Sequence, residues 1–126
     1  MTTAYLDSSC VVAAAFGEPG ARPMLTRRRS FALVVSSTLL EAEVFSALRR
    51  EQRDLTDAFH AEVALIAPDR SLSDEIARVL EAGVARGADC WHLATALYLA
   101  PDPSELTFLT LDLAQRKVAK ALGFQV

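Results

Sequence analysis

Two kinds of apolar pattern alternate along this chain of 126 residues. Short continuous apolar runs are typical of strands covered on both faces, whereas apolar residues three and four positions apart are typical of helices. The predicted strands cover residues 2–6, 31–36, 63–67, 106–111 and, as a short edge strand, 124–126. The predicted helices cover residues 10–16, 21–29, 38–53, 55–61, about 73–84, 89–99 and 113–122. This alternation predicts an α/β fold with a central parallel sheet and right-handed crossovers.

The helix predicted from Thr38 carries two acids with different expected roles. Its inward stripe consists of Leu40, Val44, Ala47 and Leu48. Thr38 and Glu41 have the spacing of a capping box, so we expect Glu41 to reach back to the Thr38 amide. Glu43 lies on the flank of the inward stripe, where an acid needs a partner.

The two later helices differ in their patterns. The first is capped by Ser71 or Ser73, and its expected apolar face consists of Ile76, Val79, Leu80 and Val84. The second opens at Asp89 and is apolar on almost every side, so it must be buried.

Four acids stand at element boundaries or on an inward face: Asp7, Glu43, Asp89 and Asp112. Asp7 and Asp112 each follow a predicted strand, and the carboxyl ends of parallel strands form the edge that carries ligand sites. Each acid also has a structural explanation: a cap for Asp89, a turn for Asp7 or Asp112, and an ion pair with Arg49 or Arg50 for Glu43.

A cluster of these acids would require a cation. Two unit charges about 5 Å apart repel by roughly 3 kcal/mol at an effective dielectric constant of about 20. Oxygen ligands without a nearby set of Cys or His favour Mg²⁺ or Mn²⁺, which support phosphoryl transfer. Ser8, Ser9 and Thr110 flank the acids and could orient water or phosphate, although such hydroxyls more often complete a turn or a cap.

Composition and charge narrow the class of protein. We expect one domain over residues 1–126, located in the cytoplasm, because no apolar run is long enough for a membrane span and no leader precedes the first strand. Cys10 and Cys90 are expected to be reduced, buried thiols. The net charge of −3 argues against a general nucleic-acid coating protein. Arginines nevertheless cluster at 22–29 and 49–53, either as solvated helix faces or as a basic rim beside the acids.

An ordered set of segments resembles the PIN-domain ribonucleases, specifically the VapC-type toxins of bacterial toxin–antitoxin modules. The segments are YLDSS at 5–9, SSTLLEAEV at 36–44, GADCWHLATA at 87–96, FLTLD at 108–112 and ALGF at 121–124. They span nearly the whole chain, and the set is distinctive although no single motif is. The chain departs from the family at Leu111, where an aromatic residue is common, and in having a second acid, Glu41, close to Glu43.

The resemblance implies a three-layer α/β/α PIN-like fold and a Mg²⁺-dependent or Mn²⁺-dependent endoribonuclease. It implies Asp7, Glu43, Asp89 and Asp112 as the catalytic and metal-binding set. It also implies a VapB-like antitoxin as inhibitor, an RNA substrate such as tRNA or rRNA, and a homodimer.

His92 and Trp91 are interpreted as structural residues. A histidine on a buried helix is more often a satisfied core residue than a base, so His92 receives no catalytic role. Trp91 is expected in core or dimer packing, and His60 on the surface.

Two other functions compete with the nuclease. One is a non-catalytic RNA-binding or protein-binding module that keeps the fold, which the intact acid set disfavours. The other is a phospho-acceptor receiver domain, which requires paired acids after the first strand and a lysine after a late strand. Neither feature is in place. The glycine-rich loops of nucleotide-binding enzymes are also missing from the sequence.

Overall fold

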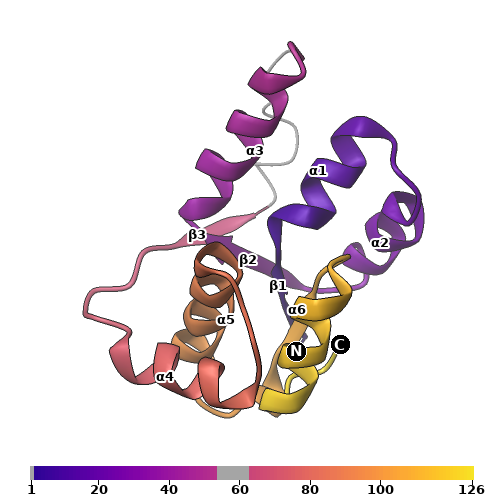
Figure 1. The fold of residues 1–126 in the computed structure, drawn as a ribbon. Coiled ribbons are helices and arrows are strands. Elements are labelled where there is room, and N and C mark those ends of the chain that lie inside the picture. The colour runs from indigo at the N-terminus through magenta and orange to yellow at the C-terminus, as the bar shows by residue number, and fades with distance from the viewer. Residues whose placement is uncertain (1, 54–62) are drawn as a thin grey trace.

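Four strands form one parallel sheet in the order β3-β2-β1-β4 in the computed structural model, which describes residues 2–53 and 63–126 (Figure 1). The strands are β1 (Thr3–Leu6), β2 (Leu33–Ser37), β3 (Ala64–Ile66) and β4 (Thr107–Leu109). The helices are α1 (Ser8–Phe16), α2 (Ala21–Arg28), α3 (Leu39–Arg50), α4 (Ser73–Ala82), α5 (Gly87–Leu99), the 3₁₀ helix η2 (Pro103–Glu105) and α6 (Leu113–Leu122). The helix predicted at 55–61 and the prediction for His60 lie outside the described residues.

The sheet is buried on both faces, which makes the fold a three-layer α/β/α sandwich. In β1, Ala4 and Leu6 pack in one apolar cluster with α1 and α3, whereas Tyr5 packs in a second cluster with α4, α5 and α6. The same alternation separates Val34 from Val35 in β2. The predicted three-layer fold and the central position of the strand at 31–36 are therefore confirmed.

The strand order creates a switch point between β1 and β4. From β1 the chain moves to β2 and β3 on one side, and then returns across the sheet to place β4 on the other side of β1. In open α/β sheets, ligands bind outside the carboxyl ends of the strands at such a point. The fold therefore favours a site where Asp7 and Asp112 follow β1 and β4.

The predicted capping box at the start of α3 is wrong. Thr38 has helical dihedral angles and makes no side-chain cap, and its amide already donates to the Ile66 carbonyl at 3.3 Å. The Ser37 hydroxyl accepts from the Leu39 amide instead, at 3.0 Å. The strand pairing extends one residue further than the sequence indicated, so the amide that Glu41 was expected to bind has another partner.

Three other boundaries differ from the predictions. Helix α4 ends at Ala82, so Val84 lies beyond the helix and is 92% exposed, and Leu80, although inside the helix, is 52% exposed and does not belong to the inward face. Helix α5 begins at Gly87, which puts Asp89 in the first turn instead of at the cap. The edge strand predicted at 124–126 amounts to one bridge between Thr107 and Gln125.

The cysteines agree with the expectation of buried thiols. Cys10 and Cys90 are both buried and free, and burial raises the pKa of the Cys10 thiol to about 12, so this thiol stays protonated. In the described part of the chain, every helix is too short or too polar to cross a membrane.

Candidate active site

Asp7 and Asp112 meet at the switch point of the sheet. The Asp7 amide donates to the carbonyl of Leu109, the last residue of β4, at 2.9 Å. Each acid also caps the helix that follows it: Asp7 Oδ2 accepts from the Ser9 amide at 3.0 Å, and Asp112 Oδ1 accepts from the Gln115 amide at 3.1 Å. The capping explanation and the site explanation are thus compatible, because a cap uses one oxygen of each carboxylate.

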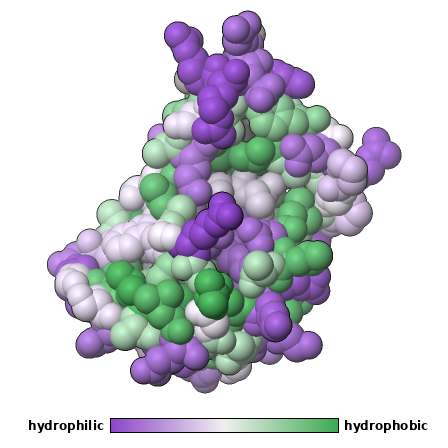
Figure 2. All heavy atoms as spheres, viewed as in Figure 1, coloured by the Kyte–Doolittle hydropathy of each residue, from purple (hydrophilic) through white to green (hydrophobic). Residues whose placement is uncertain are grey.

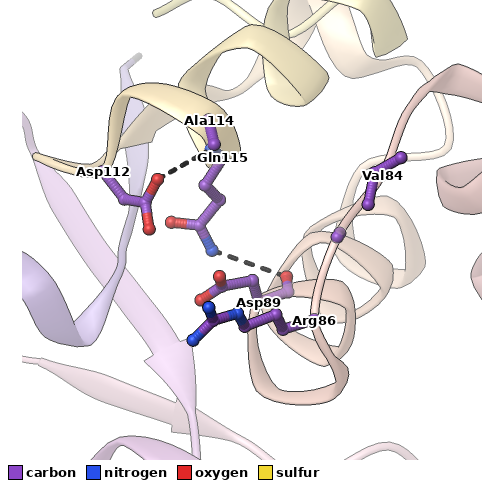
Figure 3. A pocket seen from close by; sticks show the side chains of 7 residues that line it. Val84, Arg86, Asp89, Asp112, Ala114 and Gln115 are labelled. Atoms are coloured by element: carbon purple, nitrogen blue, oxygen red, sulfur yellow. Dashed lines mark hydrogen bonds between the residues drawn. The ribbon is translucent and has the colours of Figure 1, made fainter.

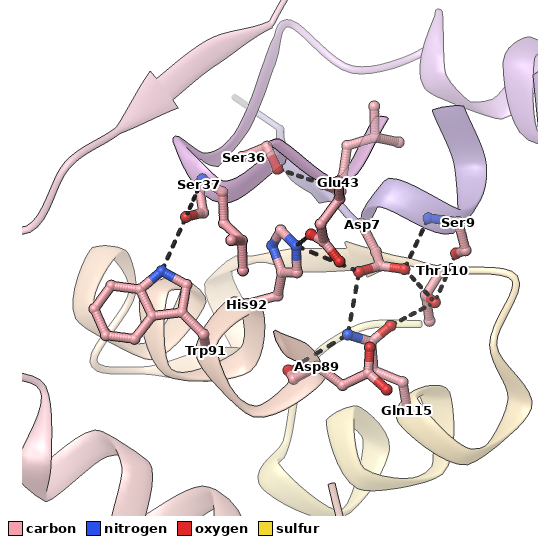
Figure 4. Close-up of polar contacts among 12 residues, drawn as sticks. Asp7, Ser9, Ser36, Ser37, Glu43, Asp89, Trp91, His92, Thr110 and Gln115 are labelled. Atoms are coloured by element: carbon pink, nitrogen blue, oxygen red, sulfur yellow. Dashed lines mark hydrogen bonds and ion pairs between the residues drawn. The ribbon is translucent and has the colours of Figure 1, made fainter. Parts of the chain in front are cut away.

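Glu43 and Asp89 complete an acidic site, by which we mean Asp7, Glu43, Asp89 and Asp112. Figure 4 shows Glu43 approaching Asp7 from α3, and Asp89 lying below it on α5. The pKa of Asp89 is raised above its usual range, first by burial and then by the negative charges of Asp7, Asp112 and Glu43, in that order, whereas His92 opposes the shift. The structure therefore brings the four predicted acids close enough to repel one another.

His92 belongs to the acidic site in a way that the sequence did not reveal. Its ring is fully buried. Its Nε2 lies 2.5 Å from Glu43 Oε1 and 3.8 Å from Asp7 Oδ1, and its Nδ1 lies 2.7 Å from the Tyr5 hydroxyl. Burial raises the pKa of Tyr5 far above its usual value, so the phenol keeps its proton. Donation from Tyr5 to Nδ1 and from Nε2–H to Glu43 satisfies all three groups.

Gln115 is the second residue that sequence reasoning missed. Its side chain is only 2% exposed. Nε2 donates to Asp7 Oδ1 at 3.2 Å and to the Asp89 carbonyl at 3.4 Å, and Oε1 accepts from the Thr110 hydroxyl at 2.7 Å (Figure 4). The available signal was a polar residue three positions before the buried Val118 of α6, on the inward stripe of that helix.

The three hydroxyl residues that were predicted to support the site, Ser8, Ser9 and Thr110, occupy different positions in the structure. Ser9 joins the ends of β1 and β4, since its Oγ accepts from the Leu111 amide at 3.0 Å and lies 3.2 Å from Thr110 Oγ1. Thr110 is buried beside Asp7 and accepts from the Asp112 amide at 3.1 Å. Ser8 points into a hollow that Glu43 also lines. Ser9 and Thr110 therefore order the two loops, and Ser8 is the hydroxyl that stands at an opening.

Two surface hollows open onto the acidic site, each with an arginine. Figure 3 shows the first, where Arg86 lies beside Asp89 and faces Asp112 and Gln115. The second lies between α1 and α3 and is lined by Ser8, Glu43 and Arg50. Asp89 and Asp112 are therefore reachable through the first hollow and Glu43 through the second, whereas Asp7 is 2% exposed and lines neither of them. A cationic side chain borders each opening.

Comparison with known proteins identifies the family. Residues 4–121 match the PIN domain family. The chain belongs to this family. It is also similar to the Ribonuclease VapC46 of Mycobacterium tuberculosis (strain ATCC 25618 / H37Rv), with 34% identity over 129 residues that cover all of this chain and 97% of the relative.

The arginine clusters of this PIN domain lie in different places. Arg28 and Arg29 line a separate hollow with Phe31, just before β2, at the amino edge of the sheet, so the alternative of a basic rim beside the acids does not hold for these two residues. The second cluster lies at the end of α3, and Figure 2 shows hydrophilic side chains gathered there. This second group borders the acids through Arg50.

Trp91 has a polar contact in addition to the expected packing. Its ring packs against the apolar cluster of α4, α5 and α6, and its Nε1 donates to Ser37 Oγ at 3.0 Å. Trp91 thus connects α5 to the end of β2.

The donor chemistry of the acidic site fits a divalent cation. Four carboxylates supply only oxygen ligands, and the charges of the other three add to the effect of burial in raising the pKa of Asp89. Within residues 2–53 and 63–126, however, no three Asp, Glu, His or Cys side chains are arranged as a ready metal site. Hydrogen bonds hold Asp7 to Gln115 and Glu43 to His92 instead.

Proposed function

We propose that this PIN domain, over residues 1–126, is a metal-dependent endoribonuclease and the toxin of a VapBC-type toxin–antitoxin system. The observation that carries the proposal is the convergence of four carboxylates near the switch point between β1 and β4, where Asp7, Asp112 and Glu43 all help to raise the pKa of Asp89. The full-length similarity to a protein named as a VapC ribonuclease supports the choice of RNA as the substrate. A toxin that cleaves cellular RNA would act in the cytoplasm.

Asp7, Glu43, Asp89 and Asp112 would hold Mg²⁺ or Mn²⁺. Such an ion activates water and stabilises the leaving oxygen in hydrolysis of a phosphodiester bond. The role of the chain is to keep carboxylates charged and oriented. Asp7 is almost fully buried, and its orientation is set by the Ser9 amide and by Gln115. The hydrogen bond between His92 Nε2 and Glu43 Oε1 holds the carboxylate of Glu43 in place.

Arg50 and Arg86 would bind phosphates of the RNA on either side of the acidic site. Both side chains are exposed, and neither makes an ion pair or hydrogen bond within the described part of the chain. An acidic site repels a polyanion, so cations at its two openings would offset that repulsion. The backbone of the RNA substrate, a tRNA or an rRNA, would then run from one hollow to the other across the acids.

The antitoxin would cover the hollow that Arg86 borders. Val84 is 92% exposed and lines this hollow together with Asp89 and Asp112, and Leu113, which is 78% exposed, stands in the chain between Asp112 and Ala114 of the same hollow. A VapB-like segment with an arginine and apolar side chains complements this surface, because the guanidinium can bind the carboxylates in place of a metal. We also propose a homodimer, on the family resemblance alone.

Co-expression with the neighbouring reading frames tests this function. The protein alone is expected to cleave RNA in the presence of Mg²⁺ or Mn²⁺, and this cleavage is expected to stop in excess EDTA. The copurified complex with the antitoxin is expected to be inactive. Asp7→Asn should abolish cleavage by the isolated protein. Full activity in EDTA would disprove the metal dependence, and a protein that binds RNA without cutting it would favour a non-catalytic module.

A further inference from the structure

The side chain of Gln115 makes its hydrogen bonds with Asp7, with the backbone carbonyl of Asp89 and with Thr110, which lies beside Asp7. An amide has two N–H donors and one carbonyl acceptor to satisfy when it is buried. The donors face Asp7 Oδ1 and the Asp89 carbonyl, and the acceptor faces the Thr110 hydroxyl. One side chain on α6 therefore touches the loop after β4, the end of β1 and the first turn of α5.

The direction of these hydrogen bonds fixes the orientation of the amide. A flipped amide would put Oε1 against the Asp7 carboxylate and the Asp89 carbonyl, which are both acceptors. The single proton of the Thr110 hydroxyl goes to Gln115 Oε1 at 2.7 Å, because Asp7 Oδ2 is further away at 3.3 Å. The same hydroxyl oxygen accepts from the Asp112 amide. A directional chain thus runs from the Asp112 amide through Thr110 and Gln115 to Asp7.

We propose that Gln115 is a positioning residue that holds the Asp7 carboxylate in place for a divalent cation without neutralising its charge. The inference rests on the proposed function. A carboxylate among three others tends to move away from them, so an ordered acidic site needs a donor on Asp7. An arginine or lysine would supply that donor but would also compete with the cation. A neutral amide supplies it and leaves the negative charge for the metal.

Apolar packing alone does not explain a glutamine at this position. A buried apolar side chain on the inward stripe of α6 would extend the cluster that contains Val118 and Ala119, with no polar group to desolvate. The amide is accommodated only because Asp7, Asp89 and Thr110 face it. The choice of residue therefore follows the needs of the acidic site.

The test compares Gln115→Met with the matched change Gln125→Met. Methionine keeps the length of the side chain and removes its hydrogen bonds, and the Gln125 side chain is exposed and away from the acids. Mn²⁺ affinity, measured by calorimetry on the protein alone, should fall at least about 10-fold in Gln115→Met, as for partners that orient metal ligands. RNA cleavage should show a lower kcat at unchanged KM. Gln125→Met should match the wild type.

Each outcome is decisive. A lower Tm of Gln115→Met with wild-type Mn²⁺ affinity would make Gln115 merely structural and would overturn the proposal. If Gln115→Met does not fold, Thr110→Val removes the partner of Oε1 and should weaken Mn²⁺ binding in the same direction; unchanged binding in that variant would also overturn it. A wild-type protein that binds no Mn²⁺ would refute the proposed function itself, and the inference with it.

Discussion

Replacing Glu43 with glutamine tests the role of its negative charge, because glutamine keeps the size and shape of the side chain. Glu43→Gln keeps an oxygen that can accept from His92 Nε2, but removes the charge that would hold a cation. Glu41→Gln is the matched control two positions away. Glu41 lies in the first turn of α3 and has no capping box to lose, since the Thr38 amide binds Ile66.

The stability change expected for Glu43→Gln without metal is small, because two effects oppose each other. Removing one charge at about 6 Å from another carboxylate gains roughly 0.7–3 kcal/mol for dielectric constants of about 80 to 20. The Glu43 side chain is 25% exposed, which favours the lower half of that range. The amide oxygen is a weaker acceptor for His92 and loses roughly 0.5–1.5 kcal/mol. The Tm should therefore stay within about 4 °C of the wild type.

Metal should separate the two variants. At a Mn²⁺ concentration of about 100 times the Kd, binding stabilises the wild type by about 2.7 kcal/mol, which raises the Tm by about 10 °C. Glu41→Gln should keep this gain and lose only a few tenths of a kcal/mol through the helix dipole. Glu43→Gln should lose most of the gain and at least about 100-fold in cleavage rate.

The assay is thermal unfolding with EDTA or Mn²⁺, run beside cleavage of a labelled RNA. The reasoning is refuted if Glu43→Gln keeps both the Mn²⁺-dependent gain and the cleavage. Loss of both in Glu41→Gln would show that the other acid of α3 serves the site.

Three further predictions test the electrostatics and the contacts around the site. Because the pKa of Asp89 is raised in the folded protein, its contribution to stability is present below the unfolded pKa of about 3.9 and is lost as the pH rises through the folded pKa. Metal-free Asp89→Asn should therefore melt higher than the wild type at pH 7, with the difference vanishing near pH 3 in a pH series with EDTA. Ser37→Ala leaves the first amide of α3 and the Trp91 indole without an acceptor, so urea unfolding should show a loss of about 1–2 kcal/mol while the Mn²⁺-dependent gain in Tm persists. Arg86→Gln should raise the KM for RNA at unchanged kcat and reduce the salt slope of binding by about 1, whereas Arg78→Gln on α4 should not.

The sequence was sufficient for the parts of the site that depend on strand ends. Asp7 and Asp112 follow apolar runs of strand length, and parallel strands bring their carboxyl ends to the same edge. The position of Glu43 near them could be predicted because it lies on the flank of an inward helical stripe. These inferences need only local periodicity and the rule that parallel strands are joined by crossovers.

Only the tertiary structure determined which groups hold the acids. His92 meets Glu43 and Tyr5 across 49 and 87 positions of the chain, and Gln115 meets Asp7 across 108. The wrong capping box at Thr38 has the same origin, because the Ile66 carbonyl on a neighbouring strand binds that amide first. Periodicity shows which face of a helix is inward, but the partner of a buried polar group depends on how the helices pack over the sheet. That packing brings together residues that no spacing along the chain connects.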